Sequence, residues 1–319
     1  MASASVTDLE PASAVQAEWR DYFDAEEYAS LTRLRDGRSW FTLALNWGII
    51  AFAFSLVAWA PGVLTILLAL FLIGARQLGL AVIMHDASHY AFLADRRRND
   101  WVGNWLGAYP IWGDLIPYRP YHLQHHAHTW SKKDPDLLLA KPFPITRASL
   151  LRKIGRDLTG RTGWKRAVAT LRRDLGTSDG KVQHRGAAGI AKLKGVLITN
   201  GALLLILSLC GHPALYLLWV VAWLTTYSLV MRIRAIAEHS MISDPADPFK
   251  NTRTTRASWL ERLFIAPNRV NYHLEHHLSM RVPHYNLPRM HALLGERGAL
   301  AGALVTNGYV EVLRRAASR

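Results

Sequence analysis

Residues 62–89 read GVLTILLALFLIGARQLGLAVIMHDASH, a mostly apolar run that ends in two histidines four residues apart. Within its second half, only Arg76 and Gln77 interrupt the apolar pattern before the histidines. A helix over this run is long enough to cross the roughly 30 Å hydrocarbon layer of a bilayer. At about 1.5 Å per residue, His85 and His89 lie about 35 and 40 Å along the helix, beyond the hydrocarbon. The run therefore predicts a membrane span that carries metal-binding side chains at one end.

Two further histidine clusters have helical spacing, His122-Leu-Gln-His125-His126 and His273-Leu-Glu-His276-His277. Residues at i, i+3 and i+4 lie on one face of a helix, so their imidazoles can converge on one ion. His239, counted from Pro213 along the last apolar run, comes to about 39 Å, near the height of the first cluster. We predict nine metal ligands: His85, His89, His122, His125, His126, His239, His273, His276 and His277.

The apolar runs predict an all-α integral membrane protein with four transmembrane helices in two hairpins. Minimal breaks at 60–62 and 210–213 join the runs in pairs, as expected for tight turns between helices. A cytoplasmic helical cap, residues 85–194 and 234–295, is expected to hold the metal site. Residues 1–38 form an N-terminal cytoplasmic segment, 39–295 a single membrane domain and 296–319 a cytoplasmic tail. The predicted spans are 39–60, 62–84, 195–211 and 213–233.

The distribution of charge orients these spans. The chain has 319 residues, of which 50% are hydrophobic and 19% charged, and a formal net charge of +14. Lys and Arg gather at 33–38, at 96–98 and across 141–194, whereas the two tight turns carry none. The positive-inside rule then places both termini and the metal site in the cytoplasm, and we expect a bacterial inner membrane. The basic face could attract anionic lipid headgroups or an acidic electron donor, and nucleic acid is the poorer interpretation.

The number and type of candidate ligands narrow the choice of metal. Imidazole suits iron, zinc, copper and nickel. Nine histidines exceed what a catalytic zinc uses, since it takes three protein ligands, so two ions with four or five imidazoles each fit better. Cys210 is the only cysteine, which excludes an intramolecular disulfide and Cys-based zinc or iron–sulfur sites. A pair of redox-active ions at a membrane surface indicates oxygen activation on a lipid, which favours iron.

Acidic residues flank the clusters. Asp86, Glu238 and Glu275 each lie beside a candidate ligand, where a carboxylate could hold the second ring nitrogen and fix the tautomer; a solvated charge is the alternative. Asp134-Pro-Asp136 follows the second cluster and is expected to close the cap through hydrogen bonds to the basic loop.

The order HxxxH, HxxHH, HxxHH between paired apolar runs resembles the integral-membrane fatty acid desaturase and hydroxylase superfamily, over roughly residues 40–295. The resemblance implies a non-haem di-iron centre, O₂ as co-substrate and a lipid acyl substrate. The HxxxH spacing of the first cluster is similar to that of acyl-lipid desaturases. No cytochrome b5-like His-Pro-Gly-Gly segment occurs, so the resemblance implies a separate electron donor of the ferredoxin, rubredoxin or cytochrome b5 type.

Other functions stay open at this point. A hydroxylase or ketolase of the same superfamily, acting on a lipid, sphingolipid or carotenoid, differs from a desaturase only after the first hydrogen is removed. A histidine-rich membrane protein that binds metal or haem is an alternative from another class. A zinc metalloprotease is disfavoured because the HExxH pattern is absent: Asp86 stands where Glu is required.

Overall fold

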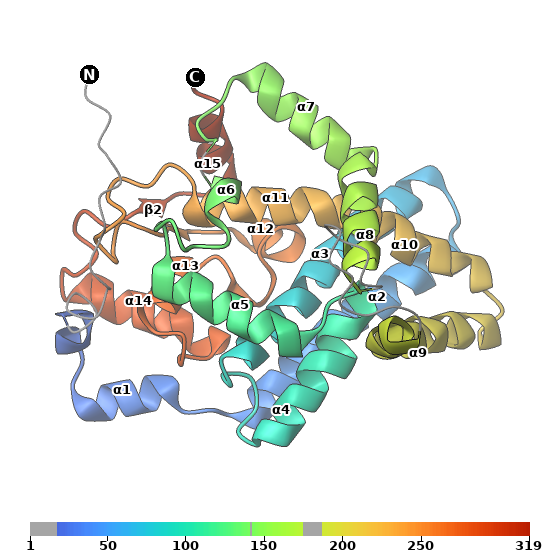
Figure 1. Cartoon of the computed structure of the whole chain (residues 1–319), viewed down its shortest axis with the longest axis horizontal. Coiled ribbons are helices and arrows are strands. Elements are labelled where there is room, and N and C mark those ends of the chain that lie inside the picture. Colours follow the sequence, from blue (N-terminus) through green and yellow to red (C-terminus); the bar gives the residue numbers. More distant parts are fainter. Residues whose placement is uncertain (1–17, 141, 175–186) are drawn as a thin grey trace.

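The computed structural model describes residues 18–140, 142–174 and 187–319. These residues are mostly helical, with two strands of two residues each (Figure 1). Parts of the predicted N-terminal segment (1–17) and of the predicted cap (141 and 175–186) lie outside the described residues.

The helix α3 (Val63–Ser88) forms the centre of the fold. Every residue from Leu72 to Ser88 is buried, because α2 (Asp36–Trp59), α10 (Tyr216–Leu224) and α11 (Thr226–His239) pack around it. The turn before α3 is closed by Thr65, whose hydroxyl donates to the carbonyl of Ala60 at 2.7 Å. The predicted continuation of this helix to the first histidine cluster is confirmed.

Three helical segments are long and apolar enough to cross a membrane: Ala25–Trp59, Val63–Ser88 and Pro213–His239. The remaining predicted span, 195–211, falls in α9 (Ala187–Leu209), where the apolar stretch Leu193–Leu209 is shorter than 18 residues. Three possible spans are therefore established by length and composition, and a fourth stays a prediction.

The last apolar run is not one regular helix. It begins as the 3-10 turn η4 (Pro213–Leu215) and breaks between α10 and α11 at Thr225, with φ −110° and ψ −86°. The helix α8 (Arg161–Asp174) packs against this break, and Arg166 Nη2 donates to the carbonyl of Trp223 at 2.6 Å. The cation thus binds a backbone oxygen beside the break, which lowers the cost of interrupting the helix.

The segment between the first two histidine clusters folds back along the bundle. The helix α4 (Arg96–Val102) continues into the π-type turn η2 (Gly103–Ala108) and the 3-10 turn η3 (Tyr109–Ile111). Asp114 then caps α5 (Leu115–His128) by accepting from the backbone N–H of Ile116 at 3.0 Å. After it come α6 (Leu137–Ala140) and α7 (Arg147–Leu158), which precedes α8.

The chain after α11 encloses the other side of the bundle. Its strands pair in parallel, with Thr254 opposite Val305. The elements are β1 (Thr254–Thr255), α12 (Trp259–Phe264), η5 (Pro267–Arg269), α13 (His273–Leu278), η6 (His284–Asn286), α14 (Leu287–Glu296), β2 (Val305–Thr306) and α15 (Tyr309–Ala316).

Both end segments pack onto this enclosure. The turn η1 (Glu18–Tyr22) and α1 (Ala25–Thr32) share a small apolar core with α13 and α14. At the other end, α15 packs on α11 and buries Tyr309, Val312 and Ala316 almost completely. The division into an N-terminal segment, a membrane domain and a tail stays a prediction.

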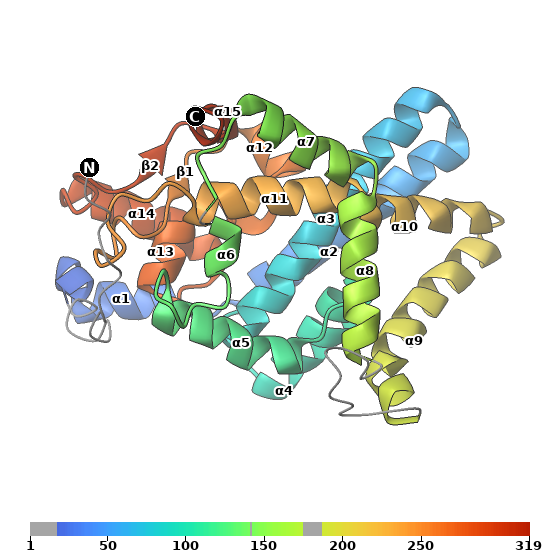
Figure 2. The same ribbon diagram turned by 45° about the horizontal axis from the view of Figure 1, so that its top comes forward.

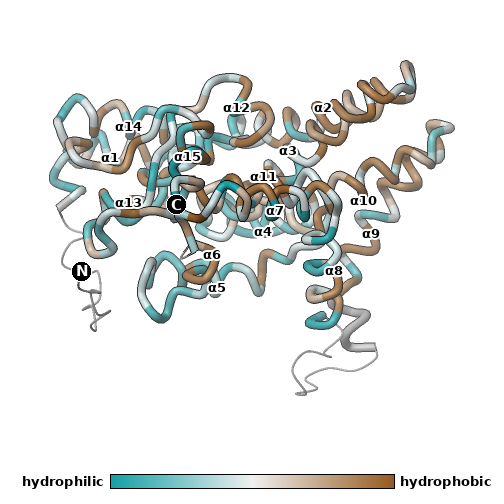
Figure 3. Tube along the Cα trace, turned by 90° about the horizontal axis from the view of Figure 1, so that it is seen from above, coloured by the Kyte–Doolittle hydropathy of each residue, from teal (hydrophilic) through white to brown (hydrophobic). Residues whose placement is uncertain are grey.

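Hydrophobic residues concentrate at one end of the molecule, along α2, α9, α10 and the first half of α3 (Figure 3). Large apolar side chains are exposed there: Trp59 is 87% exposed, Leu64 83% and Leu209 80%. Exposed apolar surface on this scale is costly in water and typical of contact with lipid. These helices therefore suggest a membrane protein.

Candidate metal centre

All nine predicted histidines lie in one cluster of rings. They come from the end of α3, from α5, from the last residue of α11 and from α13. Ring centroids are 4.9 Å apart for His89 and His122, 4.1 Å for His126 and His277, and 4.6 Å for His239 and His273. The expected convergence of the three clusters and His239 is therefore present in the fold.

The rings divide into two adjoining groups. In the first, one nitrogen from each of five residues lies within 4.8 Å of every other: His85, His89, His122, His126 and His276. The second joins His125, His239 and His277, and His273 adjoins it beside Glu238 and His239. The groups meet where His126 stacks on His277. A division into five and four imidazoles is the number expected for two ions.

The ring nitrogens are arranged as a metal site requires. Nε2 of His126 lies 3.0 Å from Nε2 of His122 and 3.1 Å from Nε2 of His276. A ring nitrogen carries either an N–H or a lone pair, so His126 Nε2 cannot donate to one of these rings and accept from the other. Nε2 of His85 and both nitrogens of His89 are buried and have no hydrogen-bond partner in the part of the chain that the structure describes. Such lone pairs are costly without a cation and favourable around one, so the residues fit a metal.

Burial keeps the rings in the form that binds metal. The pKa values of His122, His126 and His277 lie well below the ordinary value, first because burial penalises the charged ring and then because neighbouring histidines would repel it. Neutral imidazole is the ligand form of histidine. At neutral pH these rings are therefore uncharged, and their lone pairs can bind a metal ion.

One carboxylate fixes the orientation of His85, and another lies near His273. Nδ1 of His85 donates to Asp86 Oδ1 at 2.9 Å, and Nδ1 of His273 lies 3.6 Å from Glu238 Oε1. Protonation of Nδ1 leaves Nε2 free to face the cluster. The expectation for Asp86 is confirmed.

The expectation for Glu275 is wrong. Its Oε1 accepts from His291 Nδ1 at 2.6 Å, and its Oε2 accepts from the Thr254 hydroxyl at 2.5 Å. Glu275 precedes His276 in a helix, and adjacent helical residues point in different directions. The carboxylate therefore ties α13 to α14 and β1 and does not hold one of the nine rings.

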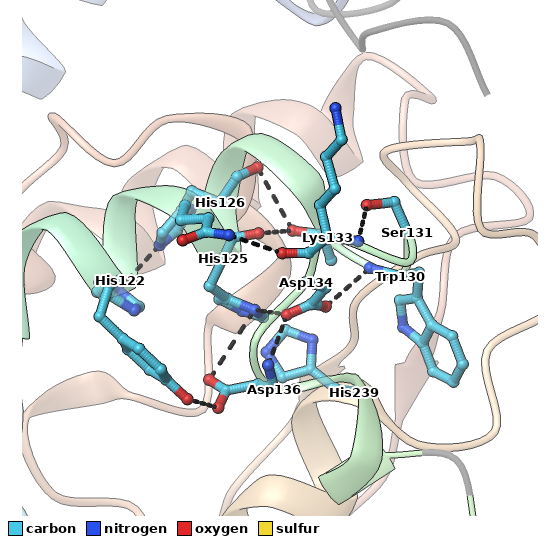
Figure 4. A network of polar contacts seen from close by, with 12 residues as sticks. His122, His125, His126, Trp130, Ser131, Lys133, Asp134, Asp136 and His239 are labelled. Atoms are coloured by element: carbon cyan, nitrogen blue, oxygen red, sulfur yellow. Dashed lines mark hydrogen bonds and ion pairs between the residues drawn. The ribbon is translucent and has the colours of Figure 1, made fainter. Parts of the chain in front are cut away.

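Asp134 is a site residue that the sequence reasoning missed. Its Oδ1 accepts from His125 Nδ1 at 2.8 Å, and its Oδ2 accepts from the backbone N–H of Trp130 at 2.9 Å (Figure 4). Asp136 Oδ2 lies 3.9 Å from the same ring nitrogen, and Asp136 Oδ1 accepts from the Tyr121 hydroxyl. Among the described residues, both carboxylates contact the site, and neither forms the expected hydrogen bond to the basic loop. The signal available was an acidic pair directly after a histidine cluster.

His284 is a second residue outside the nine predicted ligands that contacts the site. Its Nδ1 donates to Asp86 Oδ2 at 2.9 Å, and its Nε2 lies 2.9 Å from the Thr42 hydroxyl. Asp86 thus joins two imidazoles, one in the cluster and one outside it. Because Thr42 belongs to α2 and His284 to η6, this chain of bonds connects the first span to the C-terminal enclosure.

The fold and the ring cluster define a class: a helical, histidine-rich metalloprotein with helices suited to a membrane. Residues 57–307 match the family model described as Fatty acid desaturase, and the chain belongs to that family. Its histidine clusters are typical of a desaturase di-iron site. The family resemblance drawn from the histidine pattern is confirmed.

Several curated desaturases are similar to this chain. The dihydrorhizobitoxine desaturase of Bradyrhizobium elkanii is 29% identical over 228 residues, which are 69% of this chain and 65% of that protein. The sn-1 oleoyl-lipid 12-desaturase of a Picosynechococcus species is 23% identical over 286 residues, 80% of this chain and 76% of the relative. The chloroplastic omega-6 fatty acid desaturase of Spinacia oleracea is 25% identical over 288 residues, 82% and 60% respectively. The chain thus matches less than two thirds of the Bradyrhizobium and spinach proteins.

Proposed function

We propose that this protein is an O₂-dependent lipid desaturase that introduces a double bond into a fatty acyl chain, with two non-haem iron ions held by the nine clustered histidines. The observation that carries the proposal is the division of these rings into adjoining groups of five and four. Two bound iron ions would supply the activation of O₂ needed to remove hydrogen from an unactivated C–H bond.

The protein's own residues prepare this site. Asp86 and Asp134 accept from Nδ1 of His85 and His125, which directs each Nε2 toward the interior of the cluster. Rings held in this way lose little rotational freedom when an ion binds, so orientation is provided by the fold before binding. Burial of the rings also limits access of bulk water, which protects a reactive oxidant from side reactions.

The acyl-lipid assignment is supported by the relatives. Two of those reported above carry names for lipid or fatty acid desaturation. The name of the Bradyrhizobium protein instead specifies dihydrorhizobitoxine, so the family is not confined to one kind of substrate. A hydroxylase or ketolase acting on a lipid, sphingolipid or carotenoid is the alternative, and the product distinguishes it.

The membrane arrangement that we propose has four spans in two hairpins, with both termini and the metal site on the cytoplasmic side of a bacterial inner membrane. The basic residues of α7 and α8 support this orientation, because Lys and Arg favour the cytoplasmic side. Electrons would come from a separate donor of the ferredoxin, rubredoxin or cytochrome b5 type. Such donors are acidic in related systems, and the net charge of +14 would favour their approach.

Lipid mass spectrometry tests the function. The full chain is expressed with a matching donor in a bacterial host that lacks desaturases, and the acyl chains are compared with those of the host alone. Loss of two hydrogen atoms per chain is the expected result, whereas a gain of one oxygen atom would assign a hydroxylase instead.

A matched pair of variants tests the ligand assignment. His276→Ala removes a ring of the five-membered group and is expected to abolish product formation while the protein still enters the membrane. His128→Ala is the control, because His128 lies two residues after His126 but makes no contact with the ring cluster among the described residues. Retained turnover in His276→Ala would refute the assignment.

A further inference from the structure

Outside the metal centre, α7 and the start of α8 form a strongly basic groove. Its volume is about 640 Å³. The polar side chains that line it are four cations and two hydroxyls: Arg152, Lys153, Arg156, Arg161, Ser149 and Thr159. Among the described residues, no acidic side chain lines the groove.

The positive charge of the groove is uncompensated within the described part of the chain. None of its four cations forms an ion pair there. The nearby carboxylate, Asp157, is fully buried and is bound by both Nε and Nη2 of Arg232. Burial and then the neighbouring Arg232 and Arg156 lower the pKa of Lys153. Cations held this close together favour an anion between them.

An exposed apolar strip runs beside these cations. On α7, Leu151 is 66% exposed and Leu158 43% exposed, although Leu150 on the inner side is buried. On α8, Trp164 is 64% exposed. Basic residues next to an exposed strip of Leu and Trp are typical of a helix lying in the membrane interface. The groove therefore opens beside a surface suited to acyl chains. A soluble phosphate has no apolar part that could contact this surface.

The position of α8 places this surface next to a candidate membrane span. The Arg166 guanidinium lies over the Trp223 ring at 4.5 Å, and a Cβ on Gly163 would come within 2.1 Å of the Leu224 carbonyl oxygen. In both ribbon views α8 runs across the line of α10 and α11 (Figures 1 and 2). Because α10 and α11 form the candidate span Pro213–His239, α8 lies directly against a segment suited to the membrane.

We infer that this groove binds the anionic headgroup of a membrane phospholipid, with the acyl chains against Leu151, Leu158 and Trp164. Arginine suits the task because its planar guanidinium can bind two phosphate oxygens at once. The protein recognises this lipid through its headgroup. The lipid site shares no residue with the metal centre. The inference does not depend on which substrate is oxidised.

Native mass spectrometry of the full chain in neutral detergent tests the inference. Phosphatidylglycerol and phosphatidylcholine are added in equal amounts, and wild-type protein is expected to retain the anionic lipid preferentially. The variant Arg152→Gln/Arg156→Gln/Arg161→Gln should bind phosphatidylglycerol about tenfold more weakly or worse, since each cation near the surface contributes. The control Lys132→Gln/Lys133→Gln/Arg281→Gln removes the same charge from exposed positions elsewhere and should bind like wild type. Equal retention of phosphatidylglycerol by the two triple variants would overturn the inference.

Two further arms separate a lipid from a free phosphate. Leu151→Gln/Leu158→Gln leaves the cations in place but removes the apolar strip, so it should retain less phosphatidylglycerol than wild type. Inorganic phosphate at the concentration of the lipid should not displace it. Displacement by inorganic phosphate, or unchanged retention in the leucine variant, would overturn the lipid assignment. Only variants that are as monodisperse and as helical as the wild-type protein are compared. A loss of lipid binding caused by misfolding is thereby excluded.

Discussion

Nδ1 of His125 lies 2.8 Å from Oδ1 of Asp134, and the two side chains are only 3% and 4% exposed. This contact requires the chain to reverse direction directly after α5, where Trp130 adopts a positive φ of 65°. The same carboxylate accepts from the backbone of Trp130, so it holds both the ring and the turn. The geometry of the second histidine cluster therefore depends on a residue beyond its helix.

Asp134→Asn should weaken metal binding. An amide cannot offer His125 Nδ1–H a charged acceptor, and loss of such partners typically costs about 10–100-fold in metal affinity. The measurement is a competition titration with a chelator on purified protein. Asp21→Asn, at an exposed position with no side-chain partner in the described structure, is the control and should leave the affinity unchanged. An unaltered affinity in Asp134→Asn would show that the contact is only structural.

The bond between Thr42 and His284 gives a second prediction. In a neutral His284 that donates from Nδ1 to Asp86, Nε2 accepts from the Thr42 hydroxyl. Thr42→Val leaves a buried acceptor unpaired, which should lower the free energy of unfolding by about 1–3 kcal/mol. Thr42→Ser keeps the hydroxyl and should stay close to wild type. Thermal denaturation in detergent compares the pair, and equal losses in both variants would exclude the hydrogen bond as the cause.

The two groups of rings predict separable metal sites. His122→Ala alters only the group of five, and His239→Ala alters only the group of four. Each variant should therefore lose one of two iron ions, and the double variant should lose both, as measured by elemental analysis against protein concentration. If His122→Ala and His239→Ala each retained two ions per chain, the assignment of these rings as ligands would be wrong.

Close packing of α3 against α11 gives a fourth prediction. A Cβ on Gly74 would lie 2.2 Å from Thr226 Oγ1 and 2.8 Å from the backbone nitrogen of Tyr227. Gly74→Ala should therefore push the helices apart and cost about 1–3 kcal/mol of stability. It should also reduce iron content, because α3 and α11 carry ligands at their ends.

Gly48→Ala is the matched control in another candidate span. A Cβ there meets nothing within 4 Å, and alanine favours the helix by up to about 1 kcal/mol. Its melting temperature should equal or exceed that of wild type. A Gly74→Ala protein as stable as Gly48→Ala would contradict the packing argument.

Local periodicity determined much of the site. Helix geometry alone converts the spacings of the three histidine clusters, and the length of the run before His85, into positions in space. The convergence of nine rings and the helical fold were therefore predictable from the residues. The family followed from the same pattern. The break at Thr225 was not predictable, because it depends on α8 packing against the Leu224 carbonyl from more than fifty residues away.

Only the tertiary structure decided how the rings are shared. His125 and His126 are neighbours in sequence but belong to different groups, and so do His276 and His277. Adjacent helical residues point about 100° apart, and which partner each ring meets depends on how α5 and α13 pack. Asp134 likewise reaches His125 only because the intervening turn folds back. The sequence by itself therefore determined which side chains could bind metal, whereas long-range packing decided their partners, because helix periodicity acts within one element and contacts between elements do not follow from it.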